Sequence, residues 1–357
     1  MSTYKTPHQK HPPDAYDNCP VFLKNYLAYL DHNENRRPAT VIEVYCNIRD
    51  FCQYIYALRS QPDAATSKEY KKIPVENMAL HWLTVTTEEE ACDYIDLLGS
   101  VCGNAAATIS KKILILRNFF QYLVDNSEEL RVRLPFGNPF RNVETPKSPD
   151  SIAHVLTAEQ VQKLLNSTSG TTAIRDKAII HLLVTSALTL NELVRLNWGD
   201  LNERMLSIRG IKDTRIVMLT ENCYRSVMKY RMALQDYENS VDGDNPYEVT
   251  DKSPMFQSEG THRRMTGRAV SKRITIAAAA ASLCDAEKPI TANTLRDTAV
   301  AMTLMQFSEA ERPHVLSCFG FRGLGSAARF RNVPFAQSKD GDILFRGVKQ
   351  SPLSDLK

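Results

Sequence analysis

The 357-residue sequence has no uninterrupted apolar run of about 18 residues, and its first residues lack the apolar centre of a signal peptide. We therefore expect a soluble, cytoplasmic protein with no membrane partner. Its eight cysteines form no C-x-x-C pair and lie near no histidine cluster, which argues against a zinc site or a disulfide framework. They are predicted to be small buried side chains in a reducing compartment, and no metal or cofactor is expected.

An excess of one charge is also missing, because 44 Lys and Arg residues face 41 Asp and Glu residues. The balance differs along the chain: from Lys147 onward 28 basic residues face 23 acidic ones, whereas 16 face 18 before it. This asymmetry mildly favours a polyanionic ligand for the C-terminal part. Composition alone is equally compatible with an ordinary soluble enzyme.

The first 150 residues contain four stretches with apolar residues at helical spacing, near 22–30, 41–55, 88–98 and 108–123. Four such helices predict a small bundle. The segment 135–149 then contains four prolines, which break helices, and it is the natural place for a linker between domains.

The second half begins with a helix signal, because Thr157 and Gln160 have capping-box spacing before an apolar run. Residues 206–208 and 215–219 alternate around a short polar turn and predict a β-hairpin. The remaining periodic stretches predict helices near 178–187, 221–237, 267–283, 292–306 and 311–318.

Three strings in the second half carry the most information. Residues 175–180 read R-D-K-A-I-I and lead to S-A-L-T-L-N-E-L at 186–193; I-T-A-N-T-L-R-D-T occupies 290–298, and F-G-F occupies 319–321. In this order and spacing they resemble three motifs of the tyrosine recombinase (phage integrase) family. The family forms are R-D-x-A-I-x-x-L-L-x-x-T-G-L-R-x-S-E-L, T-P-H-x-L-R-H-T and L-G-H. The resemblance extends over roughly 20–333.

This resemblance implies a mainly α fold. An N-terminal helical (SAM-like) core-binding bundle would precede a mixed α+β domain of the recombinase catalytic type with a small β-hairpin or sheet. The expected boundaries are a disordered 1–18, a core-binding domain 19–133, a linker 134–150, a tyrosine-recombinase-like domain 151–333 and a tail 334–357.

The chemistry implied by the family needs a tyrosine hydroxyl that attacks a phosphodiester, and two arginines with a His or Trp that stabilise the charge on the phosphate oxygens. A hairpin lysine protonates the departing 5′ oxygen. Fixed cationic donors do this work without a metal.

Several positions depart from that pattern. Thr189 stands where the first arginine belongs, and its short neutral side chain cannot clamp a phosphate. Asn293, Asp297 and Phe321 stand where the family has histidines. Only Arg296 matches outright, three residues after Asn293 on the same helix face.

The nucleophile is the most important departure, because Phe330 occupies the position of the tyrosine and no tyrosine follows Tyr247. The hairpin lysine position is Gly210, and Lys212 is an uncertain replacement. Loss of one donor alone typically costs about 10²- to 10³-fold in rate. Strand cleavage of the usual kind is not expected, and Phe319, Phe321 and Phe330 are predicted to fill a core.

Candidate DNA contacts are basic residues that the resemblance or their local density singles out. For Arg296 the alternative is a salt bridge with Asp297 or Glu192, and for the others it is a solvated polar face. Asn293 has a weaker claim, because it can still donate a hydrogen bond to a phosphate. The full set is Arg296, Asn293, Lys212, Arg215, Lys111, Lys112, Arg117, Arg263, Arg264, Arg268, Lys272 and Arg273.

The leading hypothesis is a DNA-binding protein with a recombinase fold and no strand-cleavage activity. It would regulate a mobile element or act as an inactive partner of a recombinase, with double-stranded DNA as its ligand and self-association or an active recombinase as further partners. Two alternatives stay open at this point: an active site-specific recombinase with displaced chemistry, and a protein-interaction remnant without a DNA role.

Overall fold

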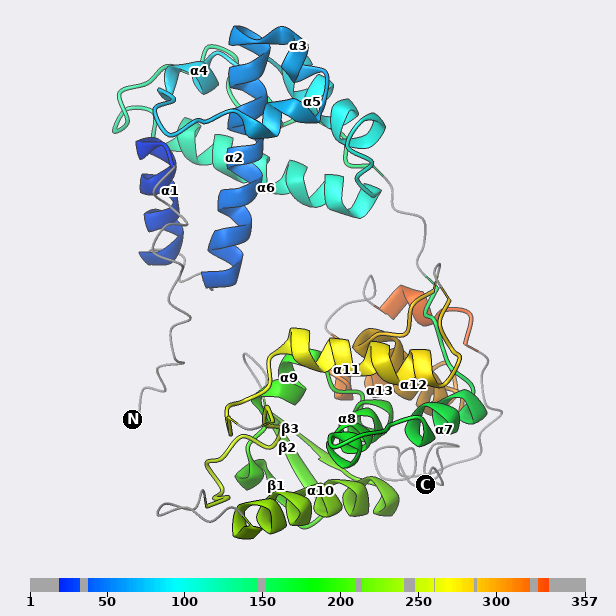
Figure 1. Cartoon of the computed structure of the whole chain (residues 1–357). Helices are drawn as coiled ribbons and strands as arrows, with labels where there is room; N and C mark the ends of the chain where they lie inside the picture. Colours follow the sequence, from blue (N-terminus) through cyan, green and yellow to red (C-terminus); the bar gives the residue numbers. More distant parts are fainter. Residues whose placement is uncertain are drawn as a thin grey trace. The chain divides into compact units, whose positions relative to one another are not determined.

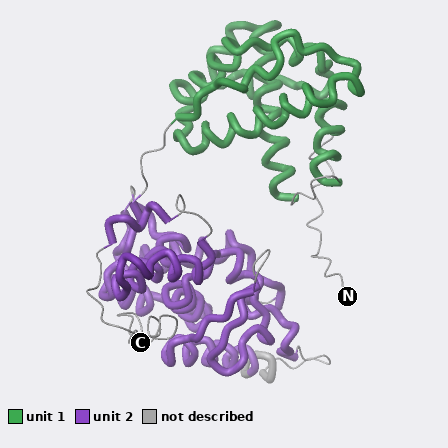
Figure 2. Tube along the Cα trace, turned by 180° about the vertical axis from the view of Figure 1, so that it is seen from behind, with its two compact units in different colours: residues 1–149 green, residues 150–357 purple. Residues whose placement is uncertain are grey.

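The structure, a computed structural model, describes residues 19–32, 38–146, 152–209, 214–240, 248–259, 261–285, 288–321 and 327–333. The predicted disordered start, the uncertain Lys212 and the tail 334–357 lie outside these residues. The chain divides into two compact units, residues 1–149 (unit 1) and 150–357 (unit 2) (Figure 2).

Unit 1 contains the four predicted helices and three short helical segments that the periodicity did not predict. The third long helix begins with a capping box, because Thr87 and Glu90 exchange side-chain to backbone hydrogen bonds. The elements are α1 (Val21–His32), α2 (Pro38–Ser60), α3 (Pro62–Ala65), η2 (Lys68–Lys72), α4 (His81–Thr84), α5 (Glu88–Ser100) and α6 (Ala106–Asp125).

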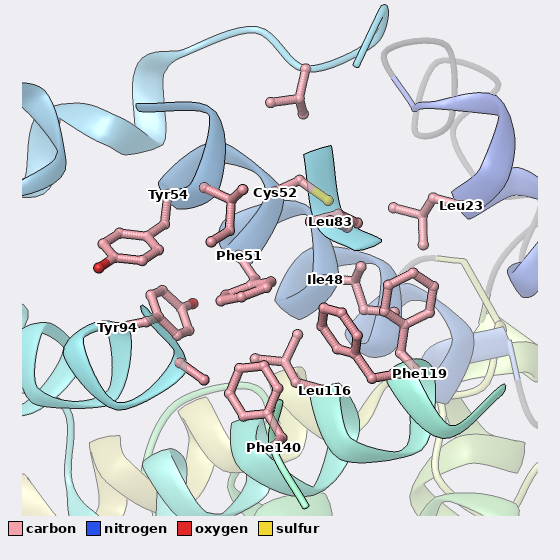
Figure 3. Packing of buried hydrophobic residues seen from close by; sticks show 14 of the residues in the cluster. Leu23, Ile48, Phe51, Cys52, Tyr54, Leu83, Tyr94, Leu116, Phe119 and Phe140 are labelled. Carbon is pink, nitrogen blue, oxygen red and sulfur yellow. The ribbon is translucent and has the colours of Figure 1, made fainter. Parts of the chain in front are cut away.

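The core of unit 1 is strongly aromatic (Figure 3). Phe51 of α2 makes edge-to-face contacts with Tyr94 at 5.0 Å, Phe120 at 5.9 Å and Phe140 at 5.1 Å between ring centroids. Phe140 and Val143 are buried in this core although they lie in the segment expected to be a linker. Unit 1 therefore extends beyond residue 133, because the chain after α6 returns to cover its aromatic core.

Unit 2 is built around α8, which is largely buried and packs against α7, α10, α11 and α12 (Figure 1). Most of its buried residues are apolar, as expected for a central helix, but Arg175, Asp176 and His181 are buried with them. The helical elements are α7 (Ala158–Asn166), α8 (Ala173–Ser186), α9 (Leu190–Arg195), η3 (Trp198–Asp200), α10 (Glu221–Ser240), α11 (Gly267–Ala280), α12 (Ala292–Leu304), α13 (Arg312–Cys318) and η4 (Ala328–Phe330).

A three-stranded antiparallel sheet completes unit 2, in the order β1 (Leu201–Asn202), β2 (Met205–Arg209) and β3 (Thr214–Met218). The predicted hairpin is β2 and β3, with Leu206 opposite Val217. The fold is thus mainly helical with a small sheet, which confirms the predicted fold class.

The beginning and the end of the described part of unit 2 are bonded to each other. The Ala153 N–H donates to the Arg329 carbonyl at 3.0 Å, and the Leu156 N–H donates to Thr298 Oγ1 at 3.0 Å. Phe330 and Val333 pack beside α12 in a second small core of this unit.

The prediction of buried cysteines was wrong for five of the eight, because Cys102 and Cys318 are only partly buried and three others are exposed. Cys46, Cys92 and Cys284 are exposed, the first two on the outward faces of α2 and α5. All eight are free thiols. Within the described ranges, no helix is both long enough and apolar enough to cross a membrane.

Candidate nucleic-acid interface

The loop after α8 positions Thr189, where the resemblance expects the first arginine. Ala187 takes a left-handed conformation with φ of 50°, which ends α8 and turns the chain. Thr189 then caps α9: its Oγ1 accepts from the Glu192 N–H at 3.2 Å, and its own N–H donates to Glu192 Oε2 at 2.7 Å. The Thr189 side chain is therefore used within its own helix.

Glu192 binds Arg215, which reaches it from β3. Arg215 Nη1 lies 2.5 Å from Glu192 Oε1 and Nη2 lies 3.3 Å from Oε2, so the contact is two-pronged. Burial raises the pKa of Glu192, but the bonds and charge of Arg215 and the bonds of Thr189 outweigh it and hold the pKa below its ordinary value. Glu192 therefore stays ionised.

Arg296 of α12 is held by backbone carbonyls. Its Nε donates to the Ala187 carbonyl at 3.0 Å and its Nη2 donates to the Phe319 carbonyl at 2.9 Å, while the Phe321 ring covers the guanidinium at 4.4 Å. Burial lowers the pKa of Arg296. Among the described residues, no carboxylate forms an ion pair with it.

The two carboxylates considered for Arg296 pair with other arginines. Glu192 binds Arg215, and Asp297 Oδ1 lies 2.8 Å from Arg329 Nη2, an ion pair whose angle gives no hydrogen bond. Burial raises the pKa of Asp297, and the nearby charges of Arg329 and Arg296 only partly offset this. Sequence reasoning missed Arg329, although its position next to Phe330 was a signal.

Phe330 is almost completely buried, with 2% of its surface exposed. Its ring meets Phe321 edge to face, with centroids 5.6 Å apart, and the Arg329 guanidinium lies over both rings. Arg296, Phe321 and Phe330 therefore lie together, as the resemblance implies. Asn293 is exposed one turn before Arg296 on α12.

The basic residues around the start of α11 divide into two groups. Arg263, Arg268 and Lys272 are exposed. Arg264 instead donates to the Val194 carbonyl at 2.7 Å and the Leu196 carbonyl at 2.9 Å.

Arg273 is also used inside unit 2, where it donates to Asp176 Oδ2 at 2.5 Å and to Thr172 Oγ1 at 2.6 Å. The structure therefore gives Arg264 and Arg273 roles in packing, and these bonds argue against their predicted DNA contacts.

Two of the three candidates of α6, Lys112 and Arg117, turn inward within unit 1. Lys112 lies 2.6 Å from the buried Asp50, and Arg117 donates to the carbonyls of Phe140 at 2.9 Å and Val143 at 2.7 Å. Both residues flank the buried face of the helix, so their long side chains turn inward. Lys111 is exposed and pairs with a glutamate of α2.

The comparisons with known proteins agree with this geometry. The model of the phage integrase family matches residues 154–327. Residues 154–327, just under half of the chain, therefore match this family, the tyrosine recombinases.

Among its relatives, tyrosine recombinase XerC of Syntrophus aciditrophicus is 26% identical over 87% of this chain and 92% of its own length. XerC of Caldanaerobacter subterraneus subsp. tengcongensis is 25% identical over 59% of this chain. The chain spans only 58% of that second relative and 42% of XerD of Listeria innocua, which is 30% identical.

Solved structures share the fold. The lambda integrase dimer bound to a COC′ core site has a TM-score of 0.59 at 16% identity, over 93% of this chain and 85% of that one. The post-cleavage complex of XerH recombinase with a palindromic difH substrate has a TM-score of 0.57 at 16% identity, over 87% and 89%.

Proposed function

We propose that this protein binds double-stranded DNA through a tyrosine recombinase fold and does not cut it. It would act as a regulator of a mobile element or as an inactive partner of an active recombinase. The observation that carries this proposal is the Phe330 ring, buried against Phe321 where the family's nucleophile belongs. A phenyl ring has no oxygen with which to attack phosphorus.

The surroundings of Phe330 support the same conclusion. The Thr189 side chain caps α9. The apolar ring of Phe321 covers the Arg296 guanidinium. Fixed cationic donors are the main source of rate acceleration in metal-free phosphoryl transfer, so their loss removes catalysis as well as the nucleophile.

DNA binding is supported by charge. Arg296 is a half-buried cation with no carboxylate partner among the described residues, and Arg263, Arg268 and Lys272 are exposed in the same unit. A polyanion such as DNA would neutralise both the half-buried Arg296 and the exposed cations. Release of counterions from the DNA then makes the binding depend on salt.

The test is retention of sheared DNA from the source organism on the intact protein at low salt, followed by denaturation. We expect specific fragments that are released as salt rises, with no DNA covalently attached, even when the retained duplexes carry nicks that trap a cleaved intermediate. Covalently attached DNA would overturn the absence of cleavage, and retention of no fragment would overturn DNA binding.

A control variant sharpens the cleavage test. Phe330→Tyr restores the hydroxyl but not the donors at Thr189 and Phe321, so it is expected to give no covalent adduct. An adduct with this variant alone would mean that the remaining groups suffice for attack, and that the phenylalanine is the sole block.

A further inference from the structure

Two guanidinium groups meet between the same two backbone segments of unit 2. Arg296 donates to the Ala187 carbonyl on one side and to the Phe319 carbonyl on the other. Arg215 approaches the second segment at the next residue, because a Cβ added to Gly320 would lie 3.6 Å from Arg215 Nη1. Gly320 has φ of 80°, a left-handed backbone conformation that favours glycine.

The first segment also holds Arg215. Glu192 grips the Arg215 guanidinium at two points and is itself fixed by Thr189, two residues after Ala187. Each arginine is therefore oriented by rigid neighbours before any ligand arrives, and such preorganisation lowers the entropy cost of binding.

The charges around this point do not cancel. Among the described residues, the guanidinium groups of Arg215, Arg296 and Arg329 face the carboxylates of Glu192 and Asp297, which leaves one positive charge among these five groups. A phosphodiester carries one negative charge, so a single DNA phosphate neutralises the group. Partly buried charges are costly unless they are compensated.

We propose that Arg215 supplies, from strand β3, the second guanidinium for the one DNA phosphate that Arg296 holds, in place of the arginine missing at Thr189. This guanidinium pair, Arg215 with Arg296, binds the phosphate without cleaving it. The Nη1 of Arg296 and the second hydrogens of both Arg215 Nη atoms are the donors. The inference rests on the proposed DNA binding and assigns its central phosphate contact.

The experiment measures the affinity of the full chain for a duplex retained in the previous test, with single phosphates replaced by neutral methylphosphonates. We expect one replacement to weaken wild-type binding about tenfold or more. Arg215→Gln and Arg296→Gln should lose no further affinity when the phosphate at that position is replaced. In the double variant, the fold-loss of affinity should be smaller than the product of the two single fold-losses, because both arginines contact the same phosphate.

Two more variants guard against a folding defect. Arg215→Gln leaves the Glu192 carboxylate unpaired, so thermal unfolding accompanies every affinity. Glu192→Gln keeps a side chain able to cap α9 and removes one negative charge beside the pair; it is expected to bind DNA several-fold more tightly. Arg225→Gln, which removes an exposed guanidinium on α10, serves as the matched loss of charge.

Three results would overturn the guanidinium pair while leaving the proposed function intact. They are unchanged DNA affinity of a folded Arg215→Gln, losses of the two arginine variants that multiply and map to different methylphosphonate positions, and unchanged affinity of Glu192→Gln. Failure of the wild-type protein to bind any duplex would instead overturn the proposed function itself.

Discussion

The basic residues singled out as DNA contacts are used differently in the two units, although Arg264 and Arg273 of unit 2 turn inward as well. In unit 1, Lys112 and Arg117 turn inward to Asp50 and to backbone carbonyls, and Arg59 pairs with Glu90. In unit 2, cations remain exposed near the start of α11, and Arg296 has no carboxylate partner among the described residues. The presence of a basic residue in the sequence therefore does not by itself indicate binding of a polyanion, because the side chain can be paired inside the protein.

The difference also separates two kinds of experimental effect. Removal of an inward-turned basic residue from unit 1 should mainly change the free energy of unfolding, whereas removal of an exposed one from unit 2 should mainly change DNA affinity. The chain offers a direct readout of both units, because its two tryptophans, Trp82 and Trp198, lie one in each. Fluorotryptophan labelling gives each unit its own fluorine NMR signal.

The strongest test of the comparison is Lys112→Met. The side chains of Lys112 and Asp50 are each 13% exposed, and removal of Lys112 leaves Asp50 with only Lys71, at 3.8 Å, and the Tyr94 hydroxyl as partners. We expect unit 1 to lose about 3 kcal/mol of unfolding free energy, seen as a shift of the Trp82 signal to lower urea. Lys72→Met, from the exposed pair with Glu69, should change it by under about 1 kcal/mol. If the Trp82 transition of Lys112→Met were not shifted, the buried pair would stabilise unit 1 no more than the exposed pair does.

Acid should weaken unit 2 through His181, which is buried in α8 and whose ring nitrogens have no hydrogen-bond partner in the described part of the chain. Burial, with the charge of Lys177, lowers the pKa of His181 from 6.5 to about 4. Between about pH 6.5 and pH 4, His181 is therefore protonated in the unfolded chain but not in the folded one. Stability present above pH 6.5 declines as pH falls toward 4, by about 3 kcal/mol in all.

The His181→Leu variant isolates this effect. The Trp198 transition of the variant should change less between pH 7 and pH 4.5 than that of the wild type, while the exposed His314→Leu should follow the wild type. Glu192, whose pKa is lowered, adds to the loss below pH 4.5 in every protein and cancels in the difference. Equal pH profiles for His181→Leu and wild type would refute the account.

Adjacent arginines of unit 2 should respond in opposite ways. Arg264→Met removes donors from the buried carbonyls of Val194 and Leu196, so we expect a loss of about 1–3 kcal/mol in the Trp198 transition. Arg263→Met, at an exposed position, should leave stability within about 0.5 kcal/mol and lower DNA affinity. If both variants altered only DNA binding, Arg264 would have to contact the ligand after all.

The smallest expected effect concerns the outer face of α11. Neutralisation of Arg268 and Lys272 together by glutamine should reduce the slope of log affinity against log salt by about 2, one for each phosphate contact. The matched change in unit 1, Lys72→Gln, should leave the slope as it is. A slope that is the same in all three proteins would mean that α11 does not lie on the DNA.

The sequence predicted the long elements well, because their signals are local. The Thr157 capping box and the hairpin strands lie where expected. The helical segments Pro62–Ala65 and His81–Thr84 are each a single turn and carry no period, so nothing in the sequence separates them from loops.

The site was predictable in composition but not in pairing. The order of the motifs predicted that Arg296, Phe321 and Phe330 belong to one site, and the three side chains are in contact in the structure. The partner of Lys112 is 62 positions away, and no periodicity could reveal that its ammonium turns inward to Asp50. Helical position predicts which face a residue lies on, but a long side chain at the edge of a face can turn either way.

The bond between Ala153 and Arg329 has a consequence for the order in which the molecule can form. The packed core of unit 1 is complete once residue 143 has left the ribosome, so this half can settle while synthesis continues. Unit 2 must bring Leu156 to Thr298 across 142 positions and Ala153 to a partner further still, and neither closure is available to a nascent chain until its last helices emerge. The half expected to hold DNA is thus the half that matures last.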